Sequence, residues 1–181
     1  MRALYLRGLV SSLSDNISAR APESRFFWIT PTGLAKYGLK EGNLVKMGTD
    51  GRIMKGAHKP SREWRLHMEI LKARKDVNAV VHTHNPITIG ITMVGKTFKP
   101  ITAEASAMLR RVKILPFERP GSEELCKMVG KNIVGRNALI LRRHGVIGVG
   151  SSLNEARAIV EAMEEDAIAQ MVMRIFHKGR P

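Results

Sequence analysis

The sequence predicts a single α/β domain spanning residues 1–181, and three observations support this fold class. A chain of 181 residues can bury one good-sized core but is short for two. Strand-like and helix-like segments alternate along it, with no internal repeat or low-complexity linker between them. Hydrophobic residues make up 44% of the chain and charged residues 25%, which is ordinary for a globular protein.

Strands are expected where short apolar runs end in turn sequences. Residues 26–30 (Phe-Phe-Trp-Ile-Thr) are stopped by the Pro-Thr-Gly sequence at 31–33, and residues 44–47 lead into the Thr-Asp-Gly turn at 49–51. Residues 78–84 form a third run, apolar and β-branched until its polar end, which predicts a buried strand.

Two further strands are expected near the end of the chain. Residues 139–141 and 146–149 are apolar and are separated by only Arg-Arg-His-Gly at 142–145. So short a link joins antiparallel neighbours, because a parallel crossover needs about a dozen residues or more. The sequence therefore predicts an antiparallel pair here.

Helix signals separate these strands. Ser61 is expected to cap a helix that runs to about Arg74, with Trp64, Met68 and Leu71 along one face. The last helix is expected to start with a capping box in which Ser152 precedes its partner glutamate by three residues. Its apolar stripe predicts core or subunit contact and consists of Leu153, Ala156, Val160, Met163, Ala167, Met171 and Ile175.

Composition excludes several classes of protein. No apolar run reaches the roughly 18 residues of a membrane-spanning helix, and the N-terminal sequence lacks a secretory signal, which predicts a cytoplasmic protein without membrane contact. Cys126 is the only cysteine, so neither a disulfide framework nor a thiolate metal cluster is expected. Gln170 is the only glutamine, and this scarcity of thermolabile side chains indicates a thermophile.

The formal net charge of +14 favours anionic partners, either nucleic acid or phosphorylated metabolites. The basic residues are scattered along the chain, and Phe, Trp and Tyr make up only 5% of it. No stacking platform or basic recognition helix is evident, which disfavours nucleic acid. A phosphorylated small molecule is the expected substrate.

Three histidines form the strongest site signal. His82 and His84 lie at i and i+2 of a predicted strand, so both imidazoles project from the same face where the strand ends. His144 lies in the short link between the last two strands, and the following glycine allows a close backbone approach. Three imidazoles with an open fourth position are typical of catalytic zinc. The expected cofactor is one Zn2+ per subunit.

Residues at a predicted helix start complete the expected site. Glu63 is expected in the first turn of its helix, where it can act as an acid/base if it also faces the metal. Ser61 and Arg62 at the same helix start are candidates for binding phosphate, as is the turn around Thr32. His67, four residues after Glu63, is expected only to pack or to contact solvent.

Six motifs in order resemble the class II aldolase and adducin family over nearly the whole chain, from about Arg7 to the last helix. They are Asn16-Ile17-Ser18, Ile29-Thr30-Pro31-Thr32-Gly33, Lys59-Pro60-Ser61-Arg62-Glu63, Ala79-Val80-Val81-His82-Thr83-His84, Gly121-Ser122-Glu123-Glu124-Leu125 and His144-Gly145.

This resemblance implies a three-layer α/β/α sandwich with a mainly antiparallel central sheet, assembled as a homotetramer with sites at subunit interfaces. It implies zinc on His82, His84 and His144 and a catalytic role for Glu63. The substrate phosphate would contact Asn16, Thr32, Gly33 and Ser61. Asp15 departs from the family pattern and is expected to repel a phosphate, whereas Arg62, where a serine is usual, is expected to restore the attraction.

The resemblance favours a metal-dependent aldehyde-lyase that cleaves a ketose 1-phosphate into dihydroxyacetone phosphate and an aldehyde through a metal-stabilised enediolate. Two alternatives stay open. One is another sugar-phosphate reaction on the same zinc site, such as 4-epimerisation or dehydration. The other is a non-catalytic assembly module like the adducin head.

Overall fold

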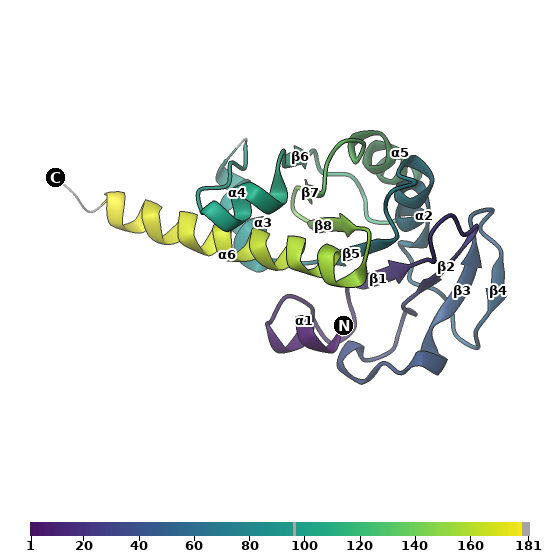
Figure 1. The fold of residues 1–181 in the computed structure, drawn as a ribbon. Helices are drawn as coiled ribbons and strands as arrows, with labels where there is room; N and C mark the ends of the chain where they lie inside the picture. Colours follow the sequence, from purple (N-terminus) through teal and green to yellow (C-terminus); the bar gives the residue numbers. More distant parts are fainter. Residues whose placement is uncertain (96, 179–181) are drawn as a thin grey trace.

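An eight-stranded sheet organises the chain (Figure 1), and the computed structural model describes residues 1–95 and 97–178. The spatial order of the strands is β4-β3-β2-β1-β5-β8-β7-β6. Every described neighbouring pair is antiparallel except β6 and β7, which run parallel. The strands are β1 (Asn16–Ala19), β2 (Phe26–Ile29), β3 (Val45–Gly48), β4 (Ile53–Lys55), β5 (Ala79–Thr83), β6 (Lys113–Leu115), β7 (Ala138–Leu141) and β8 (Gly145–Gly150).

Helices cover both faces of this sheet. Helices α2 and α5 pack on one face, and α1, α3, α4 and α6 pack on the other (Figure 1). Two short 3-10 turns, at Lys36–Gly38 and Glu41–Asn43, lie between β2 and β3. The helices are α1 (Arg2–Leu6), α2 (Trp64–Ala73), α3 (Pro86–Val94), α4 (Ala103–Leu109), α5 (Glu123–Asn132) and α6 (Leu153–Lys178).

Alternation along the central strands divides the core into two clusters. Val80 of β5 packs in the cluster beneath α2 and α5, and the next residue, Val81, packs in the cluster beneath α6. Leu139 and Ile140 of β7 divide in the same way. Because successive strand side chains point to opposite faces, a continuous apolar run is what a strand covered on both faces requires.

The predicted strands are confirmed, with ends that shift by one or two residues. The antiparallel pairing of β7 with β8 is also confirmed, with Ile140 opposite Val146. The prediction that Ser61 caps the helix was wrong, since α2 begins at Trp64 with Glu63 as its N-cap residue. The Ser61 Oγ instead accepts a hydrogen bond from the Glu63 backbone N–H at 3.3 Å, so the hydroxyl forms a turn before the helix.

Arg20 ties the end of β1 to the end of α2. Its guanidinium is buried and donates to the carbonyl oxygens of Leu71 at 2.8 Å, Arg74 at 2.9 Å and Val77 at 2.7 Å. These carbonyls belong to the last turn of α2 and the loop after it, where backbone acceptors lack intrahelical partners. The contact fixes α2 against the strand that carries Asn16, so the helix start and this strand are held in a set relation.

Helix α6 supplies carboxylates that begin two other helices. Glu164 accepts from the backbone N–H groups of Ile87 at 2.8 Å and Thr88 at 3.0 Å, in the first turn of α3. Asp166 accepts from the N–H groups of Ile101 at 2.9 Å and Thr102 at 2.8 Å, at the start of α4. The free N–H groups of a helix start favour a carboxylate, so α6 fixes where both helices begin.

Most of the predicted stripe of α6 is confirmed as core, but its two ends are exposed. Ala156, Val160, Met163 and Ala167 are buried, whereas Leu153 is 48% exposed and Ile175 is 61% exposed. The far end of α6 extends away from the sheet (Figure 1), where no other described element covers it. Among the described residues, no helix combines the length and the apolar character needed to cross a bilayer.

Replacing the carboxylate that starts α4 is expected to destabilise the whole fold. Asp166 is fully buried and also accepts from the Gln170 side chain at 2.8 Å. Asp166→Ala should lower the free energy of unfolding by roughly 3 kcal/mol, because several buried donors lose a charged acceptor. Guanidinium denaturation measures this loss. The neighbouring Glu165→Ala, on a side chain 51% exposed, should cost less than about 1 kcal/mol, and an equal cost for both variants would contradict the explanation.

Candidate metal centre and active site

Strand β5 carries the first two imidazoles of the site. His82 is fully buried and lies opposite Asn16 of β1 and Ile147 of β8 in the sheet register. His84 follows the last residue of the strand and is partly exposed. Since residues opposite each other in an antiparallel pair share a face, Asn16 is placed beside His82 on the face that α2 covers.

The turn between β7 and β8 brings the third imidazole to the end of β5. His144 closes it with a hydrogen bond from its backbone N–H to the Leu141 carbonyl at 3.0 Å, and Arg143 adopts a positive φ of 61°. A Cβ on Gly145 would lie 2.5 Å from the Thr83 carbonyl oxygen. Only glycine permits this approach, so the glycine after the histidine keeps the turn against β5.

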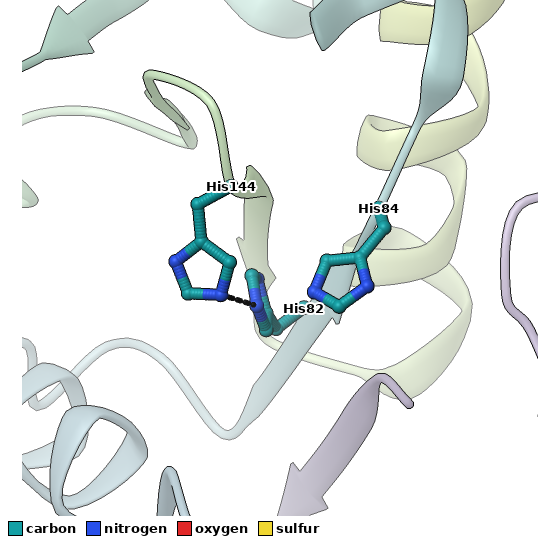
Figure 2. Close-up of side chains that lie close together, drawn as sticks. All are labelled: His82, His84 and His144. Carbon is teal, nitrogen blue, oxygen red and sulfur yellow. Dashed lines mark hydrogen bonds between the residues drawn. The ribbon is translucent and has the colours of Figure 1, made fainter. Parts of the chain in front are cut away.

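The three imidazoles converge on one point (Figure 2), as the sequence predicts. Their candidate ligand nitrogens all lie within 4.8 Å of one another. The Nε2 atoms of His82 and His144 are 3.3 Å apart. Two nitrogen ligands of a tetrahedral zinc, each at about 2.0–2.1 Å from the ion, are also separated by about 3.3 Å. The spacing therefore fits a single ion held by these rings.

Glu63 reaches the same point from the start of α2. Its Oε2 lies 3.2 Å from the His82 Nε2, and its Oε1 lies 3.3 Å from the His144 Nε2. Asn16 donates from Nδ2 to the Glu63 Oε2 at 3.0 Å. Three imidazoles and a carboxylate thus surround the point, and this nitrogen and oxygen donor set suits zinc and other divalent metals.

Charge in the site also favours a cation. Burial raises the pKa of the Glu63 carboxyl, but His82, His144 and the Asn16 amide together bring it well below its usual range. Burial lowers the pKa of His82, but Glu63 and the Val146 carbonyl more than offset this, so its net direction is upward. Burial and the neighbouring His82 lower the pKa of His144 to about 4. Metal ligands must be deprotonated, so a divalent ion beside the Glu63 carboxylate would take the place of the proton that His82 otherwise favours.

Outer contacts fix the orientation of the rings. The His82 Nδ1 donates to the Val146 carbonyl at 2.8 Å, which turns Nε2 with its lone pair toward the site. The His84 Nδ1 lies 3.3 Å from the Asp15 Oδ1, and the His84 Nε2 is buried without a hydrogen-bond partner among the described residues. An unpaired buried nitrogen in a converging set is the observation that best shows that these residues fit a metal ion.

A cavity of about 550 Å3 is lined by Glu63, His84 and His144. Backbone hydrogen bonds from the Thr32 N–H to the Lys59 carbonyl at 3.1 Å and from the Ser61 N–H to the Thr30 carbonyl at 3.1 Å pair two loops on one side of it. Gly33 adopts a φ of 77°, which favours glycine. All five predicted phosphate-binding residues line the cavity: Asn16, Thr32, Gly33, Ser61 and Arg62.

Lys36 is a cavity residue that the sequence reasoning missed. It is only 2% exposed, its Nζ donates to the Pro31 carbonyl at 2.7 Å, and it lines the same cavity. Burial lowers the pKa of this ammonium, whereas Asp15 raises it. Asp15 is turned toward His84 and accepts from the Ser11 N–H at 2.9 Å. The acid expected to repel a phosphate therefore accepts from a backbone N–H and lies beside the His84 ring.

His67 was also underestimated from sequence. It is fully buried, with its Nδ1 2.7 Å from the Ser18 Oγ and its Nε2 in a short hydrogen bond with the Asn16 Oδ1. Of the two expected roles, packing and solvent contact, the burial of His67 agrees with packing, whereas its two polar contacts were not expected. The i, i+4 spacing from Glu63 was the available signal, because it places both residues on one side of α2.

The chain belongs to the class II aldolase and adducin family, whose N-terminal domain model matches residues 1–171. This membership confirms the expected enzyme class, a class II aldehyde-lyase.

Named relatives act on phosphorylated substrates. The chain is 33% identical to the L-fuculose phosphate aldolase of Methanocaldococcus jannaschii over 166 residues, which covers 92% of this chain and 88% of that protein. It is 34% identical to a 5-methylthioribulose-1-phosphate/5-deoxyribulose-1-phosphate aldolase of Rhodospirillum rubrum, covering 99% and 80%. A 3-oxo-tetronate 4-phosphate decarboxylase of Haemophilus influenzae is 27% identical, covering 92% and 80%.

A solved structure shares the fold over almost the whole chain. The L-fuculose-1-phosphate aldolase from Thermus thermophilus superposes with a TM-score of 0.90 at 26% identity, covering 99% of this chain and 93% of that one. The mostly antiparallel α/β architecture expected from the sequence is thereby confirmed.

Adding a methyl group at Gly145 is expected to weaken metal binding. The new Cβ of Gly145→Ala would also lie 2.8 Å from the His84 Cδ2, so the turn that carries His144 must move away from β5. The variant should lose roughly 1–3 kcal/mol of stability and retain less metal after dialysis, as measured by atomic emission. Gly90→Ala, at a helical position with open space around it, should keep the stability and the metal content of the wild type. Full metal retention in Gly145→Ala would show that metal binding does not depend on the close approach of Gly145 to β5.

Acid is expected to destabilise the metal-free protein through His67. Burial lowers the pKa of this group to about 3, whereas in the unfolded chain it is about 6.5. Between these values only the unfolded state takes up the proton, so stability falls by about 1.4 kcal/mol for each unit that the pH drops.

Denaturation of chelator-treated protein across this pH range checks the assignment. His67→Gln should flatten the dependence by about that slope, because no group at this position then titrates. His58→Gln, at a half-buried position paired with Asn43, serves as the control and should keep the wild-type slope. An unchanged slope in His67→Gln would show that other groups cause the acid sensitivity.

Proposed function

We propose that the chain is a zinc-dependent aldolase that reversibly cleaves a ketose 1-phosphate, similar to fuculose 1-phosphate, into dihydroxyacetone phosphate and an aldehyde. The observation that carries this proposal is the carboxylate of Glu63 placed 3.2 and 3.3 Å from two imidazoles of a three-histidine cluster. Relatives named as fuculose-phosphate and deoxyribulose-phosphate aldolases support the substrate class.

His82, His84 and His144 would hold the zinc. When bound by these residues, a divalent ion would supply Lewis-acid polarisation of the ketose carbonyl and stabilisation of negative charge on the substrate oxygens. Nitrogen ligands from three histidines, with an oxygen donor nearby, match catalytic zinc better than magnesium or calcium, which prefer oxygen ligands. The single cysteine is buried, and burial raises the pKa of its thiol to about 11, so Cys126 is unsuited as a ligand.

Glu63 would move the proton of the reaction. When the carbon–carbon bond breaks, its electron pair stays on the phosphate-bearing fragment, and the departing fragment becomes the aldehyde as its hydroxyl proton passes, directly or through water, to the Glu63 carboxylate. The Glu63 carboxylic acid then protonates the carbon that received the electron pair, which yields dihydroxyacetone phosphate. In the synthetic direction the Glu63 carboxylate removes that same proton.

The cavity would hold the substrate phosphate. Thr32 and Ser61 offer hydroxyl donors, Gly33 allows the backbone close to the anion, and Arg62 supplies a guanidinium. Asn16 can take part because its Nδ2 carries two hydrogens and only one donates to Glu63. The Lys36 ammonium adds a buried positive charge to the same space, which offsets the carboxylate of Asp15.

The assembly and setting of the enzyme are part of the proposal. We propose a cytoplasmic homotetramer of three-layer α/β/α subunits, with sites at the subunit interfaces. Exposed apolar side chains on the last turns of α6 support subunit contact, since such surfaces commonly mark interfaces. They are Val172, Met173, Ile175 and Phe176, with exposed fractions between 44% and 75%.

Removing the acid/base should stop proton transfer without emptying the metal site. In Glu63→Gln the amide keeps the size of the side chain but cannot exchange a proton with the substrate carbon. The variant should retain zinc and lose at least about 100-fold of the wild-type exchange rate. Loss of deuterium from labelled dihydroxyacetone phosphate, followed by NMR, measures this step. Retained exchange would remove Glu63 from the mechanism.

Product analysis separates the proposal from its rivals. An aldehyde released from a phosphorylated ketose supports aldol cleavage, whereas an isomeric or dehydrated product indicates 4-epimerisation or dehydration on the same site. Carbon dioxide release would indicate the chemistry of the decarboxylase relative. A non-catalytic assembly module is disfavoured by the four intact residues at the metal centre, and a zinc content near zero in protein purified without chelator would revive it.

A further inference from the structure

A chain of buried polar groups runs from the sheet to the carboxylate of Glu63. The Ser18 Oγ lies 2.7 Å from the His67 Nδ1, the His67 Nε2 is hydrogen-bonded to the Asn16 Oδ1, and the Asn16 Nδ2 lies 3.0 Å from the Glu63 Oε2. Ser18, Asn16 and His67 are 1%, 3% and 0% exposed. These three side chains therefore lie in the core. Of the four hydrogen-bonded groups described, Asn16 and Glu63 line the cavity, whereas Ser18 and His67 do not.

The donors and acceptors that these side chains offer allow the row of hydrogen bonds to run in one direction. An ionised Glu63 only accepts, so the Asn16 Nδ2 must face it as the donor and the Asn16 Oδ1 must face His67 as the acceptor. The His67 Nε2 must then carry the hydrogen. Burial lowers the pKa of His67 to about 3, so the ring is neutral near pH 7 and its Nδ1 accepts from the Ser18 hydroxyl. In this arrangement each hydrogen bond joins one donor to one acceptor. If the bonds ran in the opposite direction, the Asn16 Oδ1 would face the Glu63 carboxylate and two acceptors would meet.

The two oxygens of Glu63 consequently differ. Oε2 receives the Asn16 amide at 3.0 Å and lies 3.2 Å from the His82 Nε2. Oε1 lies 3.3 Å from the His144 Nε2, but it is buried and, unlike Oε2, has no hydrogen-bond partner among the described residues. A proton added to Oε2 would meet an N–H that already points at that oxygen, whereas Oε1 is free to bind it.

From this geometry we infer that His67 and Ser18 are positioning residues which, through Asn16, orient the Glu63 carboxylate so that Oε1 is the oxygen that exchanges a proton with substrate. The inference rests on the proposed aldolase function for its catalytic consequence. The hydrogen-bond direction follows from the contacts, and the His67 tautomer follows from the contacts together with the burial that keeps the ring neutral. Asn16 thus has a role beside phosphate binding, because its amide holds the acid/base group in place.

The competing explanation is that these hydrogen bonds only pair buried polar groups and do not position Glu63 for catalysis. In that case, breaking them would lower stability and zinc retention, and any loss of activity would follow the loss of folded, metal-loaded protein. A positioning role instead predicts a kcat defect in protein that is folded and loaded. A displacement of the reacting group by about 1 Å can cost roughly 100-fold in rate.

Three variants of the chain and one matched control test the inference. His67→Leu removes the donor to Asn16 and should reduce kcat roughly 100-fold, with KM and zinc content unchanged. His67→Gln can still donate to Asn16 and accept from Ser18, so it should recover most of the lost kcat. Ser18→Ala should give an intermediate loss.

The control is Thr88→Val, which loses a buried hydrogen bond to Glu164 in the cluster on the other face of the sheet. It should be destabilised to a similar extent and keep its kcat. A kcat in His67→Leu equal to that of the wild type would overturn the inference. A fall in zinc content and a rise in KM that accompany the fall in kcat would also overturn it, since that outcome indicates a structural role.

Imidazole nitrogen NMR of the zinc-loaded wild type gives a readout that needs no substrate. The inference predicts a neutral His67 with hydrogen on Nε2 and a bare Nδ1, and a ring protonated on Nδ1 would overturn it. If the wild type cleaves no ketose phosphate, the proposed function fails, whereas the inferred orientation of Glu63 is still decided by this spectrum. The two failures are therefore distinguishable, and the spectrum decides the matter even if His67→Leu does not fold.

Discussion

The position of one carboxylate between three imidazoles is the constraint on which the rest of the structure depends. Glu63 lies within 3.3 Å of His82 and His144, although it comes from a helix and they come from the sheet. That meeting requires β1, β5 and β8 to pair in one register, and it requires α2 to begin beside Asn16, at the start of β1. Arg20 helps to meet the second requirement from the other end of β1, because its buried guanidinium binds carbonyls at and just after the end of α2 and so holds the helix along the strand.

Such a site is costly to build, because burying charged and polar groups lowers stability unless each is paired. This chain keeps the polar groups in directed hydrogen bonds and surrounds them with apolar strands. The His82 Nδ1 binds the Val146 carbonyl, and Asn16 joins His67 to Glu63. The His84 Nε2, which is left unpaired among the described residues, lies on the side of its ring that faces the other two imidazoles (Figure 2). Burying this unpaired group lowers the stability of the fold, and metal binding can offset that loss.

Local patterns predicted that the three histidines belong to one site, but not the contacts behind them. The i, i+2 spacing of His82 and His84 fixes their shared face whatever the sheet looks like, and the short link around His144 determines an antiparallel turn. His67 could not be placed in the same way. Its partners lie 49 and 51 residues away on β1, so its role depends on strand register and on how α2 docks. The same limit explains why Lys36 was missed and why Ser61 was wrongly expected to cap α2.

X-ray absorption spectroscopy of the zinc-loaded protein tests the central claim most directly, because it reports the atoms bound to the ion. The account predicts a shell of nitrogen and oxygen at about 2.0–2.1 Å, with outer scattering that requires three imidazole rings. A sulfur shell at about 2.3 Å, or outer scattering from fewer than three rings, would contradict the convergence of His82, His84 and His144 on a single metal.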